Sequence, residues 1–245
     1  MGHFVPARKV ILLLFAVPIL ICLSVAFSVS RFAILTALEV QSSANSSSQT
    51  TPRKTSPPYT GDLSIFEDKE RDKKLQVERV MDILGLKEGA HVADIGAGSG
   101  WFTVRAAKRV GSTGIVYAVD INPESIAYIT RRTQREGIGN VHAILSEEDD
   151  PGLSKNSIDS VLLLKTYHEV AHPVLLLENL RSTLRSGARV GVIDRNGKGD
   201  DHGVSRDVVI QEAAQAGYQL LEQYDFVKGD GQDYFLVFRS NSAPR

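Results

Sequence analysis

The sequence contains a single cysteine among 245 residues, Cys22, which lies inside an apolar run near the N-terminus. A lone thiol excludes an intrachain disulfide, and its position excludes a cysteine metal cluster or a cysteine nucleophile in the rest of the chain. The six histidines are scattered along the sequence, so we expect no metal site. The formal net charge is only −1, and no nucleic-acid partner is expected, because phosphate binding depends on clustered Lys and Arg.

Long apolar runs are also absent, with one exception at the N-terminus. Val10 to Val29 is almost entirely apolar, with Arg8 and Lys9 before it and Arg31 after it. About 20 apolar residues are enough to cross a bilayer, whereas the apolar core of a signal peptide usually has ~7–15. We therefore expect residues 1–31 to be a transmembrane anchor, with a cleaved signal peptide as the alternative.

The rest of the chain divides into a polar stretch and a folded region. Residues 41–59 are rich in Ser, Thr and Pro and offer little for a core to bury. We predict a flexible linker over residues 32–60 on that basis. Residues 61–245 have the composition of one globular domain and are long enough to form a sizeable core.

Strand and helix patterns alternate through the folded region. We predict strands over 91–95, 114–119, 141–145, 157–164, 188–194, 218–227 and 234–238, and helices over 67–84, 99–110, 123–136, 173–184 and 204–216. Such alternation indicates a mostly parallel sheet with helices on both faces. The last two strands flank a short Gly229-Asp230-Gly231 turn and should pair as an antiparallel hairpin. The expected fold class is α/β: a Rossmann-like, doubly wound, mostly parallel seven-stranded sheet with a C-terminal antiparallel hairpin.

A glycine-rich loop follows the first predicted strand. It contains Gly96, Gly98 and Gly100, with Asp94 in front and Trp101 behind. Dinucleotide-binding loops use Gly-x-Gly-x-x-Gly, and Trp101 is far too bulky for the third glycine of that pattern. A tight turn alone needs fewer glycines, so we favour a ligand-binding loop over a purely structural turn.

The glycine loop, together with the stretch from Val116 to Asp120, resembles motifs I and II of class I S-adenosylmethionine-dependent methyltransferases. The resemblance covers Leu75 to about Phe238. It is greatest to methyltransferase domains of type 11 or type 25, and to a bacterial subgroup with Glu-Asp-Asp-Pro after the third strand and a Tyr-His pair after the fourth.

The resemblance implies S-adenosylmethionine as the cofactor and a role for each motif. Asp94 and the three glycines would hold its methionine part. Asp120 would bind both ribose hydroxyls, since a carboxylate can accept two hydrogen bonds from a diol. Glu148 or Asp149, after the third strand, would contact the adenine. The alternative interpretation of Asp94 and Asp120 is that they cap helices.

The methyl acceptor is expected at the carboxyl ends of the fourth and fifth strands, where open α/β sheets bind ligands. His168 is the preferred general base because of its intrinsic pKa, Glu169 is the alternative, and Tyr167 would line the pocket. Asp194 and Arg195, at the end of the fifth strand, are further candidates to face the acceptor.

Two further features concern the acceptor. His202, in the loop over 197–203, is a candidate to close over the acceptor as a lid. The subgroup usually has an acid where Lys165 stands and often a second histidine where Glu169 stands, so the acceptor of this chain is expected to differ.

These patterns predict an enzyme that transfers a methyl group from S-adenosylmethionine to a small molecule, a lipid or quinone-like compound, or a protein side chain. Ser56-Pro57-Pro58-Tyr59 resembles the motif of amino-group methyltransferases, but it lies in the predicted linker and not after a core strand. The alternatives are a non-catalytic S-adenosylmethionine-binding module and an NAD-dependent oxidoreductase. The charges around the apolar run favour a domain outside the cell, whereas the methyl donor is made inside, so both orientations of the anchor stay open.

Overall fold

The computed structural model of the protein describes residues 52–68, 70–198, 202–228 and 232–241. The expected membrane segment, most of the expected linker and the Gly229-Asp230-Gly231 turn lie outside these residues, as do residues 199–201 of the loop that carries His202. Among the helices that are described, none combines the length and the apolar composition that a membrane span requires.

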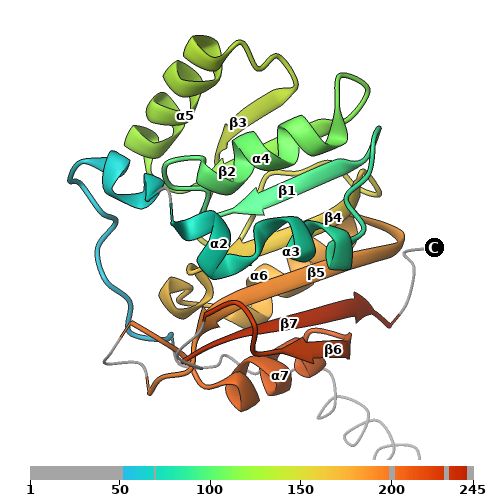
Figure 1. The fold of residues 1–245 in the computed structure, drawn as a ribbon. Coiled ribbons are helices and arrows are strands. Elements are labelled where there is room, and N and C mark those ends of the chain that lie inside the picture. Colours follow the sequence, from blue (N-terminus) through green and yellow to red (C-terminus); the bar gives the residue numbers. More distant parts are fainter. Residues whose placement is uncertain (1–51, 69, 199–201, 229–231, 242–245) are drawn as a thin grey trace, which may run out of the picture. The chain divides into compact units, whose positions relative to one another are not determined.

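Seven strands form one sheet, in the order β3-β2-β1-β4-β5-β7-β6 (Figure 1). The strands β1 to β5 are parallel, and β7 runs antiparallel to both of its neighbours, β5 and β6. This confirms the predicted mostly parallel sheet and its antiparallel C-terminal strands. The bounds are β1 His91–Ile95, β2 Ile115–Asp120, β3 Val141–Leu145, β4 Ile158–Leu164, β5 Leu184–Arg195, β6 Tyr218–Tyr224 and β7 Asp233–Ser240.

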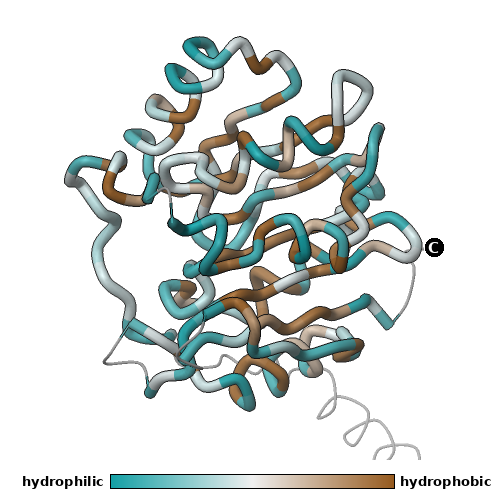
Figure 2. The backbone as a smooth tube through the Cα atoms, in the orientation of Figure 1, coloured by the Kyte–Doolittle hydropathy of each residue, from teal (hydrophilic) through white to brown (hydrophobic). Residues whose placement is uncertain are grey.

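Helices cover both faces of the sheet, because the central strands are apolar on both sides. In β4, Val161 and Leu163 pack against α6 (Pro173–Thr183) and α7 (Arg206–Gln215). Leu162 and Leu164, which point the other way, belong to the core beneath α3 (Val77–Leu84) and α4 (Trp101–Val110). The longest of the described helices, α5 (Pro123–Glu136), packs on β2 and β3. Figure 2 shows the resulting apolar strands between helices with polar outer surfaces.

Several boundaries differ from the sequence-based expectation, three of them at features of the backbone. The helix predicted over 67–84 is divided into α2 (Arg71–Leu75) and α3, because Gln76 between them is left-handed with φ 47°. Helix α4 begins only at Trp101, since Gly100 is also left-handed and ends the glycine loop. Strand β5 starts at Leu184 and runs through a segment that resembles a turn in sequence, with an irregular register against β4 at Ile158.

Candidate active site

The glycine loop, the loops after β2 and β4, and the end of β5 meet at one edge of the sheet. Strand β1 lies between β2 and β4, and β5 lies next to β4, all four parallel. Their carboxyl ends therefore point to the same edge (Figure 1). This is the edge at which open α/β sheets bind ligands, as expected from the sequence.

The three glycines of the loop are all left-handed, but for different reasons. Their φ angles are 70° at Gly96, 55° at Gly98 and 71° at Gly100. A Cβ atom on Gly96 would lie 2.2 Å from the Thr166 side chain, and one on Gly100 would lie 3.0 Å from Ile129. A Cβ atom on Gly98 would meet nothing within 4 Å. Packing thus explains two of the glycines, and Gly98 leaves a bare backbone surface that a ligand can approach.

Asp120 lies directly beside Gly98. Its Oδ2 accepts a hydrogen bond from the Gly98 backbone N–H at 2.8 Å, and its Oδ1 accepts one from the Asn122 N–H at 2.9 Å. Burial raises the pKa of Asp120, and these two hydrogen bonds oppose the rise. The N-cap of α5 is Asn122, whose side chain accepts from the Glu124 N–H. The alternative that Asp120 caps this helix is therefore wrong.

Asp94 is almost fully buried beneath the glycine loop. The Thr103 hydroxyl donates a hydrogen bond to Asp94 Oδ2 at 2.6 Å. Burial raises the pKa of Asp94 to about 6, although the Thr103 hydroxyl and the positive charge of Arg71 both act to lower it. The guanidinium of Arg71 lies 4.6 Å from the centre of the Trp101 ring. Arg71 was not predicted, because its place beside β1 depends on the break between α2 and α3.

The acidic loop after β3 is joined to Asp120 through the backbone. The Ser146 N–H donates to the Asp120 carbonyl oxygen at 3.0 Å. Glu148 is exposed, whereas Asp149 is half-buried and accepts a hydrogen bond from Asn179 on its backbone oxygen at 2.8 Å. Contact of either side chain with an adenine stays a prediction.

On the acceptor side, His168 is held by Asp194. His168 lies in the short helix η2 (Tyr167–Glu169), after β4, and Asp194 lies at the end of β5. The fully buried Asp194 carboxylate lies 2.9 Å from His168 Nδ1 and accepts the His168 backbone N–H at 3.0 Å. Because a carboxylate only accepts, Nδ1 donates its N–H to Asp194, and Nε2 lies on the side of Glu169, 3.6 Å from its Oε1.

Tyr167 and Lys165 differ from what the sequence led us to expect. Tyr167 is fully buried, and its hydroxyl donates to Glu212 at 2.9 Å, so its side chain lies in the core and does not line the open edge. Lys165 forms an ion pair with Asp233, which is almost fully buried on β7. Lys165 stands where the resembled subgroup usually has an acid, and in this chain Asp233 supplies a negative charge beside it.

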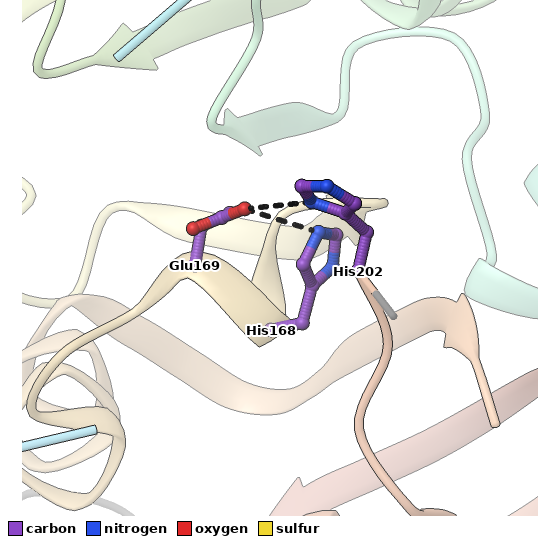
Figure 3. A group of neighbouring side chains, drawn as sticks. All are labelled: His168, Glu169 and His202. Carbon is purple, nitrogen blue, oxygen red and sulfur yellow. Dashed lines mark hydrogen bonds and ion pairs between the residues drawn. The ribbon is translucent and has the colours of Figure 1, made fainter. Parts of the chain in front are cut away.

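The histidines are less scattered in space than in the sequence. Glu169 Oε1 lies 3.6 Å from His168 Nε2 and 3.4 Å from His202 Nδ1 (Figure 3). These three residues bring their ligand atoms within 4.8 Å of one another, so scattered histidines no longer support the expectation of no metal site, which itself stays a prediction. His168 and His172 also form a His-Glu-x-x-His stretch, a signal that we overlooked. This stretch binds zinc when it is helical, but here η2 ends at Glu169 and α6 begins only at Pro173.

Residues 52–60, expected to be part of a flexible linker, lie against this edge; we call them the strap. The Ser56 N–H donates to Glu169 Oε2 at 2.6 Å, and the Tyr59 carbonyl oxygen accepts from Asn122 at 2.9 Å. Asn122 follows β2 and Glu169 follows β4, with β1 between these strands. The strap, drawn in blue in Figure 1, thus crosses the carboxyl end of β1, and it brings the Ser-Pro-Pro-Tyr stretch to the edge of the site.

Arg53 fastens the strap to the domain. Its guanidinium donates two hydrogen bonds to the Glu212 carboxylate, at 2.7 and 2.8 Å, and one to the Tyr167 backbone oxygen at 2.8 Å. We expect Arg53→Ala to lower the free energy of unfolding by about 2–3 kcal/mol, because half-buried Glu212 loses its cation. Urea denaturation of the full-length protein in detergent, followed by the fluorescence of Trp101, measures this change.

The matched control is Arg131→Ala, which removes an exposed arginine of α5. We expect this substitution to change the free energy of unfolding by no more than about 0.5 kcal/mol. Similar small changes in the two variants would show that the Arg53 contacts contribute little to stability.

The chain is similar to known methyltransferases in sequence and structure. A family model described as "Methyltransferase domain" matches residues 86–223. Protein-L-isoaspartate O-methyltransferase of Pyrococcus horikoshii is 31% identical over 102 residues, 42% of this chain and 44% of that protein. A ubiquinone/menaquinone biosynthesis C-methyltransferase of Hydrogenovibrio crunogenus is 29% identical over 122 residues, 49% of this chain and 48% of that protein.

These alignments span less than half of either curated relative. A crystal structure of an S-adenosylmethionine-dependent methyltransferase from Aquifex aeolicus is covered more fully: it is 27% identical, with a TM-score of 0.67, over 72% of this chain and 95% of that one. Since the family model matches more than half of the chain, the protein belongs to the methyltransferase domain family, and its domain is of the class I S-adenosylmethionine-dependent type.

Proposed function

We propose that this protein transfers a methyl group from S-adenosylmethionine to an acceptor at the carboxyl edge of the sheet. The observation that carries the proposal is the open space at Gly98 beside the Asp120 carboxylate. There, backbone and acid offer what a ribose diol needs, close approach and two hydrogen-bond acceptors. The bound cofactor supplies an electrophilic methyl group on a sulfonium, and Asp94 would hold its cationic amino group.

The acceptor side offers a base in a fixed orientation. Asp194 keeps the proton on His168 Nδ1, so Nε2 is available to take a proton from a hydroxyl or ammonium acceptor. Asp194 acts as a positioning residue in this scheme. Glu169 is the alternative base, and its carboxylate is the stable form: burial acts to raise the pKa of Glu169, but hydrogen bonds from Ser56 hold it below its usual value.

We further propose a membrane anchor at Val10 to Val29 and a lipid or quinone-like acceptor. The length and apolar composition of this run support the anchor, and an anchored enzyme meets membrane compounds directly. The similarity to a methyltransferase of ubiquinone and menaquinone biosynthesis is consistent with such an acceptor. Full-length protein should stay with the membranes after an alkaline carbonate wash, and its release would contradict the anchor.

Calorimetric titration of the full-length protein in detergent tests the cofactor part of the proposal. We expect micromolar binding of S-adenosylmethionine and S-adenosylhomocysteine. We expect no binding of NADH, because Trp101 stands where dinucleotide-binding loops have their third glycine. Failure to bind either methyl-donor compound would overturn the proposed function. Methyl-labelled cofactor and a membrane lipid extract then test catalysis: label in the extract supports an enzyme, and binding without label favours a non-catalytic module.

A further inference from the structure

Three potential metal ligands from two separate loops converge at the acceptor side of the site (Figure 3). His168 and Glu169 come from η2, after β4, and His202 comes from the loop after β5. Glu169 Oε1 lies between the two imidazoles, 3.6 Å from His168 Nε2 and 3.4 Å from His202 Nδ1. Thr166, two residues before His168, hydrogen-bonds to the Gly96 backbone oxygen, so the cluster is next to the glycine loop.

The spacing of the three atoms is compatible with metal ligands. His202 Nδ1 and Glu169 Oε1 form a long hydrogen bond at 3.4 Å, whereas the 3.6 Å between His168 Nε2 and Glu169 Oε1 exceeds the usual hydrogen-bond length of about 2.7–3.2 Å. With metal–ligand bonds of about 2.0–2.2 Å, two ligands of a tetrahedral ion lie about 3.3–3.6 Å apart. Both measured distances, 3.4 and 3.6 Å, fall in the second range.

Hydrogen bonds with Asp194 and Ser56 fix the orientation of two of the three candidate ligands, His168 and Glu169. Metal-bound histidines almost always donate their other ring N–H to a carboxylate or carbonyl group. The fully buried Asp194 carboxylate fills that role for His168 Nδ1. The Ser56 N–H binds Glu169 Oε2, which leaves Oε1 turned toward the histidines. His202 has a 74% exposed side chain and can adjust its position without disturbing the core.

We propose that His168 Nε2, Glu169 Oε1 and His202 Nδ1 bind a divalent transition-metal ion of the zinc class. Two imidazoles and one carboxylate suit such an ion, and three protein ligands leave a fourth position open. The proposed site differs from the one that the His-Glu-x-x-His stretch would give, because His172 is not among the clustered residues.

The consequence for catalysis rests on the proposed function. An open position beside the glycine loop would take an oxygen atom of the methyl acceptor and favour its deprotonated form. With the ion bound, His168 Nε2 is a ligand and no longer a base, so the two roles of His168 exclude each other. Metal binding itself does not depend on the proposed function and is measured separately.

The experiment is a calorimetric titration of the untagged full-length protein, stripped with a chelator, with Zn²⁺ alone. We expect one Zn²⁺ per chain, and a loss of affinity of about 100-fold or more in His202→Ala, since even outer-shell changes cost 10–100-fold. Asp194→Asn should weaken binding by about 10–100-fold. His172→Ala is the matched control and should bind Zn²⁺ like the original chain, because only the sequence stretch, and not the structural cluster, contains His172.

Three results would overturn the metal site: no stoichiometric Zn²⁺ binding by the original chain, unchanged binding in His202→Ala, or a loss in His172→Ala that equals the loss in His202→Ala. Each preparation is also titrated with S-adenosylmethionine. Because His202 is exposed and contacts Glu169 and His168 rather than the glycine loop, cofactor binding should survive in His202→Ala, which shows that the variant is folded. Cofactor binding without Zn²⁺ binding would reject the metal site alone and leave the proposed function in place.

Discussion

Replacing Asp120 with alanine is expected to weaken the binding of S-adenosylmethionine about 100-fold. The substitution removes the acceptor of the ribose diol and leaves the N–H groups of Gly98 and Asn122 without their partner. Lost hydrogen bonds to a charged group, with buried donors left unpaired, amount to about 3 kcal/mol, and each 1.4 kcal/mol is a factor of ten in affinity. Calorimetric titration of the full-length protein measures the change.

The comparison variant is His168→Ala, which should leave cofactor affinity within about twofold and reduce methyl transfer once an acceptor is identified. Asp207→Ala removes an exposed acid from the first turn of α7 and serves as the control for a lost negative charge. Equal losses of cofactor affinity in the Asp120 and His168 variants would contradict the division of the edge into a cofactor side and an acceptor side.

The cofactor side was predictable from the sequence because its determinants are local. Asp94, the glycines and Asp120 occupy a strand, the turn after it and the end of the next strand, so periodicity and turn chemistry place them. The sequence did not show which glycine faces open space. Gly96 and Gly100 are fixed by Thr166 and Ile129, residues that follow β4 and lie on α5, and such contacts depend on the assembled sheet.

The acceptor side depends on contacts that no local pattern contains. Asp194 is 26 residues from His168, and His202 is 33 residues from Glu169. Tyr167 and His168 are adjacent in η2, yet one enters the core and the other faces the edge. A three-residue helix is too short to show periodicity, so the sequence could not separate them. The strap was missed for a related reason, since each of its contacts named above involves either its backbone or the single residue Arg53.

We expect the affinity for S-adenosylmethionine to rise about tenfold between pH 5 and pH 7, through the ionisation of Asp94. The pKa of this buried carboxyl is about 6, and the cationic amino group of the cofactor binds only its ionised form. Below pH 6 the carboxyl must release a proton before the cofactor can bind, so affinity increases with pH and levels off near pH 7. The amino group itself stays largely protonated over this range.

The stability of the cofactor-free protein should respond to pH in the opposite sense. The pKa of Asp94 is raised from 3.8 to about 6 on folding, so its contribution to stability is complete below about pH 4 and is lost as the pH rises through 6. The loss is ~3 kcal/mol, since each pKa unit corresponds to 1.36 kcal/mol. Saturation with the cofactor should remove this decline, because the bound amino group stabilises the carboxylate.

Asp94→Asn separates this residue from other groups that titrate in the same range. Asparagine keeps the size of the side chain and an oxygen that can accept the Thr103 hydroxyl, but it cannot ionise. At pH 7.5 the cofactor-free variant should therefore be more stable than the original chain and bind S-adenosylmethionine more weakly, with an affinity that hardly changes between pH 5 and pH 7. If the pH dependence of cofactor affinity were unchanged in Asp94→Asn, another group would be responsible for it. Asp120 would be the first candidate, because burial raises its pKa as well. A more stable but weaker-binding variant would mean that the buried charge of Asp94 serves cofactor binding and lowers the stability of the cofactor-free protein.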